Sequence, residues 1–396
     1  MITTGLVFRL GLSQFLCWGI SYYLIGVFGE AIARDTGWSL TLTYSGFSGA
    51  LVIMGLTSSF VGRLVDRHGG RRVMTGGSAL MAVSFLGLSL SRNLVVYDIA
   101  WAFMGLAMRM TLYEAAFATL AHLGGASARR PISQITLLGG LASTAFWPIG
   151  HMLETVLGWR GALVCYAVVA VLTIPLHWSI PDHRRRQPAT AGPSSSIRPL
   201  ARSRPDRIAA SLLYMIMVTA AAFVNSGISA HMIGIMSGIG LGMAAAVWLS
   251  ALRGIGQSSA RLVEILFGRR LHPLSLGVVA TALLPLSFAA GLSSGGSILA
   301  AVAFALCYGA GNGLLTIVRG TQPLVLFDNS HYGLLMGRLT APGFFVSALA
   351  PIVYASIIEI SGAAAALHVS LVLAILVMAS AAALRWRFRK QIAAAA

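Results

Sequence analysis

Long apolar stretches are the feature that most constrains this chain, because a helix needs about 20 apolar residues to cross a bilayer. Twelve such stretches are predicted to be helices, at residues 6–30, 41–61, 73–91, 95–120, 133–156, 160–180, 208–230, 243–267, 273–292, 297–318, 333–357 and 364–384. Charged residues make up only 10% of the 396 residues, against roughly 25% in a soluble domain. We therefore expect an all-α membrane protein with twelve transmembrane helices.

A polar break at residues 181–207 separates the first six stretches from the last six. It is rich in Pro, Ser and Arg, a composition that cannot bury a core, so we expect a mobile basic linker. The predicted organisation is an N-terminal six-helix bundle over residues 1–180, the linker over 181–207, and a C-terminal six-helix bundle with a basic tail over 208–396.

A basic loop between the second and third stretches, residues 62–72, is repeated half a chain away. A shift of 198 residues places Ala260–Glu264 on Gly62–Asp66, and 268–270 on 70–72. The shift is half of the 396-residue length. A repeat of that span indicates two similar halves rather than a solenoid of small units.

The net charge of +17 would suggest nucleic-acid binding in a soluble protein, so the position of the basic residues decides its meaning. Most of them fall in loops on the same side as both termini, and the opposite loops hold only Arg34, Arg92 and Arg160. This bias predicts that the termini and the linker are cytoplasmic, in a multi-pass protein of the cell (inner) membrane. It leaves no reason to expect a nucleic-acid partner.

The sequence shows no motif for an enzymatic reaction, a cofactor or a metal. The three cysteines lie inside apolar stretches, where they act as small core residues. No ATPase motif and no nucleophile–base pair is found. We expect a monomeric protein without enzymatic activity, cofactor or metal.

The basic loop resembles the signature that major facilitator superfamily transporters carry between helices two and three. The matching pattern is Gly-x-Leu-x-Asp-Arg-x-Gly over Gly62–Gly69, with Val65 in place of the usual small residue and Gly70 before the two following arginines. The resemblance extends to the twelve stretches, the basic linker and the degraded second copy. Together with Gly37–Ser39, the loop is similar to bacterial monocarboxylate and oxalate/formate carriers. The resemblance implies two pseudo-symmetric six-helix bundles and transport by alternating access.

A cytoplasmic gate is predicted in the basic loop and its second copy. A carboxylate at the end of helix two, amid arginines, can pair across the cleft only while the cytoplasmic side is closed. The alternative is that these arginines only determine topology. The predicted gating residues are Asp66, Arg67 and Arg71 in the loop, and Arg261 and Glu264 in the second copy, where Arg269 is a further expected partner.

Four charged residues lie inside the predicted helices: Arg109, Arg253, Arg338 and Glu114. An ionisable residue at bilayer depth costs at least about 2.5–3.5 kcal/mol, so each is a functional candidate. Three cations and one anion favour the entry of an anion, and arginine binds carboxylates in a bidentate manner. The resemblance implies that Arg253 and Arg338 match the basic residues that bind the dianion in oxalate/formate carriers.

Each of these charges also has an alternative interpretation. Arg109 is either a substrate ligand or a structural residue; the resemblance implies a coupling role, although the Gln-Gly that commonly follows such an arginine is missing. Glu114 is either the counter-charge of Arg109 or a proton carrier. Gln257 follows Arg253 by four residues, so both lie on one helix face. The other predicted substrate-binding residues are Tyr22, Tyr23, Trp147, Asn225 and Asn312, whose aromatic members more often pack or anchor at the membrane interface.

The sequence therefore predicts a secondary active transporter of a small organic anion, a mono- or dicarboxylate. Both a symporter that uses protons and an antiporter that exchanges anions fit. Two alternatives remain open: a drug or metabolite exporter whose membrane arginines are structural, and a membrane sensor that keeps the fold without transport. The expected partners are the anion, protons and the lipid bilayer.

Overall fold

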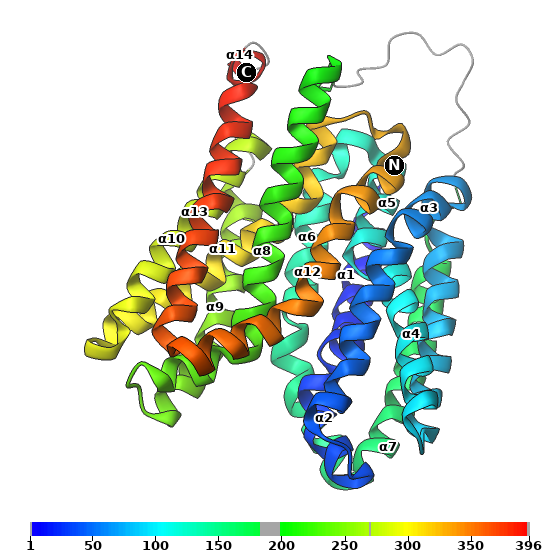
Figure 1. The fold of residues 1–396 in the computed structure, drawn as a ribbon. Helices are drawn as coiled ribbons and strands as arrows, with labels where there is room; N and C mark the ends of the chain where they lie inside the picture. The colour runs from blue at the N-terminus through cyan, green and yellow to red at the C-terminus, as the bar shows by residue number, and fades with distance from the viewer. Residues whose placement is uncertain (1, 183–198, 269–270, 394–396) are drawn as a thin grey trace. The chain divides into compact units, whose positions relative to one another are not determined.

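The computed structural model describes residues 2–182, 199–268 and 271–393, and every regular element in these ranges is a helix (Figure 1). The expected all-α architecture is therefore confirmed. Most of the predicted linker, residues 183–198, lies outside the described residues, as do Arg269 and Arg270 of the second motif copy.

The chain forms two compact units. Unit 1 consists of Met1–Ser196 together with Asn329–Ala341, and unit 2 consists of Ile197–Asp328 together with Pro342–Ala396. The start of the predicted eleventh helix thus belongs to the first unit. The bundle boundaries expected at residues 180 and 207 stay a prediction.

Unit 1 is built from nine helical elements of the N-terminal half and the start of one later helix. The elements are α1 (Thr4–Cys17), the π-helix η1 (Trp18–Tyr22), α2 (Leu24–Thr36), α3 (Leu40–Leu90), α4 (Leu94–Thr111), α5 (Tyr113–Gly124), the 3₁₀ turn η2 (Gly125–Ala128), α6 (Arg129–Gly140), α7 (Ala142–Trp178), the 3₁₀ turn η5 (Asn329–His331) and the first part of α12 (Tyr332–Ser361).

The helices of unit 1 begin where the sequence supplies N-capping side chains. The side chains of Thr3, Ser39 and Asn93 accept hydrogen bonds from the backbone N–H three residues ahead, which satisfies one of the donors left open at a helix start. Helix α2 ends at Gly37, whose left-handed φ of 71° is open to glycine without strain.

Two long helices of this unit each contain a sharp turn at a glycine. Gly69 in α3 has φ 79° and ψ 157°, and Gly158 in α7 has φ 68° and ψ 166°. Side chains other than that of glycine rarely adopt such angles. The turns fall between predicted helices two and three and between predicted helices five and six. Each long helix therefore corresponds to two of the predicted membrane helices.

Predicted helix four is broken between α4 and α5. Leu112 is extended, with φ −78° and ψ −170°. In a membrane a freed backbone group needs a partner within the protein, because lipid supplies none. The Gln14 side chain supplies it: its Nε2 donates to the Thr111 carbonyl at 2.8 Å. A polar residue of α1 thus compensates the break in helix four.

Unit 2 contains the remaining helices. They are α8 (Arg204–Gly238), α9 (Met243–Phe267), α10 (Pro273–Leu292), the 3₁₀ turn η4 (Ser294–Gly296), α11 (Ile298–Leu326), the rest of α12, α13 (Ala363–Arg387) and α14 (Arg389–Ala393). Ahead of α8, the backbone N–H groups of Leu200 and Ala201 donate to the carbonyls of Val325 and Leu326, both at 3.0 Å. The chain that follows the linker therefore runs beside the end of α11.

In the described parts of the chain, nine helical stretches are long and apolar enough to cross a membrane. Two of them hold two predicted helices each, since Gly69 and Gly158 divide them. Helix α9 is not among the nine; it is the element that carries Arg253, Gln257 and Arg261. With α9 included, the helical stretches correspond one to one with the predicted twelve.

Candidate functional site

The Asp66 carboxylate lies at the N-terminus of α12, within unit 1. Its oxygens accept hydrogen bonds from the backbone N–H groups of Gly333 at 2.9 Å and Leu334 at 2.8 Å. The first N–H groups of a helix have no acceptor within the helix, and the positive end of the helix dipole favours a carboxylate. The contact is therefore a charge-assisted helix cap that joins α3 to α12.

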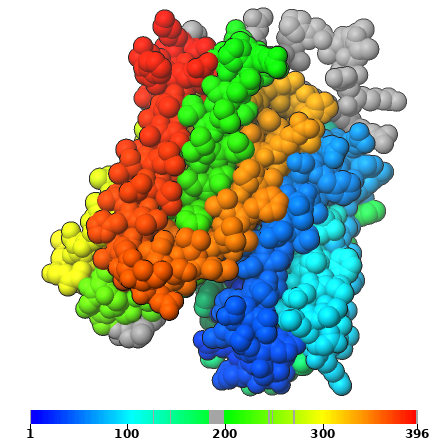
Figure 2. All heavy atoms as spheres, viewed as in Figure 1, coloured from blue at the N-terminus to red at the C-terminus, as the bar shows by residue number. Residues whose placement is uncertain are grey.

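Glycines allow the two helices to approach this closely. A Cβ added at Gly62 would collide with the Gly333 carbonyl, and a Cβ at Gly337 would collide with the carbonyl of Ser58. Small residues at such contacts bring membrane helices together along their backbones. Figure 2 shows the start of α12, in orange, directly against α3, in blue.

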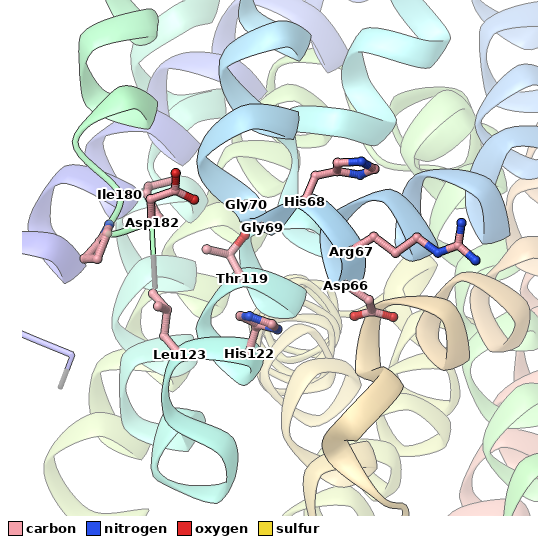
Figure 3. A pocket seen from close by; sticks show the side chains of 11 residues that line it. Asp66, Arg67, His68, Gly69, Gly70, Thr119, His122, Leu123, Ile180 and Asp182 are labelled. Carbon is pink, nitrogen blue, oxygen red and sulfur yellow. The ribbon is translucent and has the colours of Figure 1, made fainter. Parts of the chain in front are cut away.

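The arginines expected to pair with Asp66 do not contact it. The guanidinium of Arg71 lies 4.1 Å from the ring centroid of Trp178, and Arg67 is exposed and extends away from the carboxylate (Figure 3). The expectation of arginine partners is therefore wrong for this conformation: the helix end, and not a guanidinium, holds Asp66. The gating role of Asp66, Arg67 and Arg71 stays a prediction.

A cavity of about 280 Å³ lies beside this loop. Its lining includes His68, Thr119, His122 and Asp182 in addition to Asp66 (Figure 3). Acidic and basic groups are mixed there, and no predicted substrate-binding residue is among them. The cavity therefore belongs to the loop and is distinct from the predicted substrate residues.

Arg109 is buried in unit 1 and joins α4 to α3. Only 1% of it is exposed. Its Nε donates to Ser58 Oγ at 3.0 Å, and its Nη2 donates to the Ser58 carbonyl at 3.1 Å. A buried guanidinium that is hydrogen-bonded to a neighbouring helix fits a structural role. Substrate contact by Arg109 stays a prediction that this geometry does not favour.

Glu114 lies in the first turn of α5, directly after the break at Leu112, and is 4% exposed. The N-terminus of a helix favours a negative charge. The broken helix thus accounts for an acid at this depth without a substrate. Whether Glu114 carries a proton stays a prediction.

Arg253 lies half-buried near the middle of α9 in unit 2, between two neutral partners. Its Nη2 donates to Asn225 Oδ1 at 3.0 Å, and its guanidinium carbon lies 5.1 Å from the ring centroid of Tyr308. Among the residues that the structure describes, no carboxylate lies within salt-bridge distance of Arg253. A guanidinium has five N–H donors, so donors remain for an anionic ligand.

Close packing of α9 on α11 fixes the position of Arg253. A Cβ at Gly309 would collide with the Arg253 carbonyl, and a Cβ at Gly313 would lie 2.5 Å from the Gln257 carbonyl. Gln257 is half-buried one turn after Arg253, and Asn312 is half-buried on α11. Unit 2 thus carries the predicted residues Arg253, Gln257 and Asn312 on two closely packed helices, and it brings Arg253 and Asn225 into contact.

The second copy of the motif differs from the first. Arg261 is 1% exposed; its Nε donates to the Gly313 carbonyl at 3.3 Å, and its Nη2 donates to Thr316 Oγ1 at 3.1 Å. Glu264 is 8% exposed and also lies within α9. These contacts join α9 to α11 inside unit 2. A second gate at Arg261 and Glu264 stays a prediction.

The remaining predicted residues lie in unit 1. Arg338 is exposed, and it makes no hydrogen bond or ion pair with any residue in the described ranges. Trp147 on α7 is 47% exposed, and its ring lies 3.1 Å from the position of a Cβ at Gly26. Tyr22 and Tyr23 are half-buried beside Trp18.

Two buried polar residues were not predicted. His177 is fully buried, with Nδ1 2.8 Å from Ser78 Oγ, which lies 2.7 Å from Thr173 Oγ1; a histidine inside an apolar stretch was the signal for it. Arg319 lies within α11, which continues to Leu326, whereas the predicted helix ended at residue 318. Its carbonyl accepts a hydrogen bond from the Tyr214 hydroxyl at 2.7 Å.

Known proteins similar to this chain have the same architecture. The family model of the Major Facilitator Superfamily matches residues 10–318. A structure of the proton:xylose symporter XylE bound to 6-bromo-6-deoxy-D-glucose has a TM-score of 0.74 at 12% identity, covering 97% of this chain and 95% of that chain. The human organic anion transporter MFSD10 (TETRAN) has a TM-score of 0.69 at 16% identity, covering 95% and 99%. The predicted fold is thereby confirmed.

A curated relative from Pseudomonas aeruginosa is named "Transcription regulatory protein OpdE". It is 25% identical over 166 residues, which are 41% of this chain and 41% of the relative. The match thus spans about two fifths of the relative's length.

Proposed function

The chain belongs to the major facilitator superfamily, and we propose that the substrate it carries as a secondary transporter is a small organic anion, a mono- or dicarboxylate. The protein is a multi-pass membrane transporter and not an enzyme. The sequence similarity of its basic loop to monocarboxylate and oxalate/formate carriers supports this class of substrate.

The observation that carries the proposal is the environment of Arg253. Its charge is held by the neutral groups of Asn225 and Tyr308 and by no carboxylate in the described residues. A cation in a low-dielectric setting is stabilised when an anion joins it, and the planar guanidinium matches a carboxylate with two parallel hydrogen bonds. A carboxylate substrate supplies the missing charge.

The roles of the other residues follow from this proposal. Asn225 holds the guanidinium in place, and Gln257, one helical turn away, adds an uncharged donor. Arg338 is a second candidate cation for a dicarboxylate, because it has no partner among the described residues. Glu114 is the candidate proton carrier, and release of Asp66 from α12 is the candidate gating step. Proton symport and anion exchange both fit.

One solved structure of this fold belongs to a human organic anion transporter, so the fold accommodates such cargo. The charges inside the described helices point in the same direction. Basic residues are in excess: Arg109, Arg253, Arg261 and Arg319 stand against Glu114 and Glu264. Such an excess opposes a cationic substrate, so it disfavours an exporter of lipophilic cations.

Uptake of radiolabelled acetate and oxalate into proteoliposomes, with and without a pH gradient, tests the proposal. A hydrogen bond to a charged group contributes about 1.5–3 kcal/mol, and about 1.4 kcal/mol is tenfold. Arg253→Ala should therefore reduce uptake at least tenfold, and Arg253→Lys should retain part of it. Arg92→Ala, at an exposed loop position, is the control. Uptake that survives Arg253→Ala, or no carboxylate flux at all, contradicts the proposal.

A second candidate function is a membrane sensor, because the Pseudomonas relative is named a transcription regulatory protein. A sensor would bind an anion without moving it. A thermal shift caused by a carboxylate, combined with no flux in the same preparation, would favour the sensor. Saturable flux would exclude it.

The orientation of the protein is also part of the proposal. The basic loops support cytoplasmic termini and a cytoplasmic linker, in a monomer of the cell membrane. Labelling of single cysteines introduced at Arg34 and Arg202 with an impermeant reagent tests this. Only the cysteine at position 34 should react from outside the cell.

A further inference from the structure

Aromatic side chains gather around the π-helix of helix one. The aromatic group, as we define it, consists of Trp18, Tyr22, Tyr23, Phe47 and Tyr113. The ring centroid of Trp18 lies 4.9 Å from that of Tyr22, 4.9 Å from that of Tyr113 and 6.3 Å from that of Tyr23. Tyr22 in turn lies 5.3 Å from Phe47 of α3. Three segments of unit 1 thus contribute rings to one group.

The π-helix explains how two consecutive tyrosines both reach Trp18. In an α-helix, residues five apart diverge by about 140° around the axis, so only Tyr22 would face Trp18. The wider π turn, with hydrogen bonds five residues apart, brings Tyr23 toward the same face. Such turns often occur at functional sites. On the opposite side, Gly19 is covered by the Phe146 ring of α7, where a Cβ would collide.

The aromatic group differs from the packed aromatic core of the same unit. Trp101, Tyr97 and Phe117 are 0–1% exposed and act as core residues. Trp18, Tyr22, Tyr23 and Phe47 are only half-buried. Rings that are left partly uncovered on several elements are able to receive a further planar group.

Trp18 also has an open hydrogen-bond donor. Its Nε1 atom is buried and has no acceptor among the described residues. A buried indole N–H normally finds a partner, and an unsatisfied one costs free energy. A ligand that carries an oxygen next to an aromatic ring would supply both the ring contact and the acceptor.

We propose that the aromatic group binds an aryl ring of the substrate, so that the carried anion is an aromatic carboxylate. This inference rests on the proposed organic-anion function and narrows its substrate class. The aryl ring packs edge-to-face or offset against Trp18, Tyr22 and Phe47, the geometries that aromatic pairs prefer. An oxygen of the ligand accepts the Trp18 N–H.

Aromatic groups also bind cations through their π faces, so the charge of the ligand has to be decided. The described helices carry an excess of arginines over acids, which opposes a second cation. The buried Glu114 next to Tyr113 is already placed at the positive end of α5. An anionic aryl ligand therefore fits better than an organic cation.

Benzoate and cyclohexanecarboxylate form the matched pair of probes, since they share charge and approximate size and differ in the aromatic face. Aromatic pairs add a preference of about twofold to tenfold beyond burial. We expect saturable uptake of both by the full-length protein in proteoliposomes, with a ratio of kcat/KM that favours benzoate by this amount.

Variants assign the preference to the aromatic group. Trp18→Leu and Phe47→Leu should bring the ratio close to one while uptake of cyclohexanecarboxylate continues. Trp18→Phe keeps a ring and should keep part of the preference even where Trp18→Leu folds poorly. Trp248→Leu, at a side chain 57% exposed on α9, is the control and should leave the ratio unchanged.

The outcomes separate the two hypotheses. Equal uptake of both probes overturns the aryl subsite and leaves the organic-anion function standing, as does a benzoate preference that survives both leucine variants. Uptake of phenyltrimethylammonium in place of the carboxylates overturns both. Lack of uptake of any carboxylate, acetate and oxalate included, also overturns both.

Discussion

Asp66 and Gly333 meet through a single hydrogen bond of 2.9 Å, from the Gly333 N–H to Asp66 Oδ1, although 267 residues separate them in the chain. The second oxygen accepts the next N–H of α12 at 2.8 Å. Two oxygens of one carboxylate thus satisfy two of the open donors at a helix start. The contact depends on the negative charge, because both oxygens must act as acceptors.

Asp66→Asn should therefore loosen the start of α12. An amide offers one acceptor and places its own N–H₂ against the second donor, so a charge-assisted hydrogen bond of about 1.5–3 kcal/mol is lost. Hydrogen–deuterium exchange in the segment Asn329–Ala341 should accelerate at least tenfold. Asp98→Asn, at an exposed position of α4, is the control. Unchanged exchange would show that the carboxylate does not hold the helix.

Gly62→Ala should destabilise the protein, because the new Cβ collides with the Gly333 carbonyl. Overpacking of this kind costs roughly 1–3 kcal/mol. Gly49→Ala is a matched control on the same helix: no atom lies within 4 Å of its added Cβ, and replacing a helical glycine by alanine gains roughly 0.5–1 kcal/mol. Thermal unfolding in detergent should give a lower Tm for Gly62→Ala and an equal or higher Tm for Gly49→Ala.

Ser58→Ala should lower stability without raising KM for a carboxylate. The substitution removes the hydroxyl that Arg109 Nε contacts at 3.0 Å and leaves that donor buried. The expected loss is about 1.5–3 kcal/mol, as for other hydrogen bonds to charged groups. Denaturation and uptake kinetics on the same preparation test this. A raised KM with unchanged stability would assign Arg109 to the substrate.

Asn225→Asp should abolish anion transport although the side chain keeps its shape. The new carboxylate would stand where Asn225 Oδ1 now accepts from Arg253 at 3.0 Å, and it would neutralise the guanidinium permanently. Asn225→Ala, which only removes the contact, should raise KM by about tenfold or less. If Asn225→Asp transports as well as wild type, Arg253 does not bind the anion.

Glu114→Gln tests proton coupling. We expect uptake driven by a pH gradient to be lost while exchange of internal for external substrate continues, because exchange needs no net proton movement. Loss of both activities together with a lower Tm would instead show that the carboxylate serves to stabilise the start of α5.

Local features of the sequence predict most of the fold, because membrane helices need long apolar runs and tight turns need glycine. The turns at Gly69 and Gly158 fall where loops are expected for this reason. The break at Leu112 is not predictable in the same way, since it depends on Gln14, which is 97 residues away from its partner carbonyl. A break of this kind becomes visible only when its distant partner is known.

The candidate site shows the same division. The i, i+4 spacing of Arg253 and Gln257 is a local property, and the packed helix α9 carries both. The partner of Arg109 is Ser58, an ordinary residue of an apolar stretch, and Trp18 joins the aromatic group only because the helix widens at Trp18–Tyr22. Charge alone drew attention to Arg261, and only the described contacts place it against α11.

The assignment of Asn329–Ala341 to unit 1 has a consequence for engineering. The chain passes from one unit to the other after Ser196, again after Asp328 and once more after Ala341. A fragment that stops at residue 196 would lack part of its own unit, and the complementary fragment would carry a foreign segment. Chimaeras with related transporters should therefore exchange residues 329–341 together with the first half, since a single crossover in the linker would divide a cooperative unit.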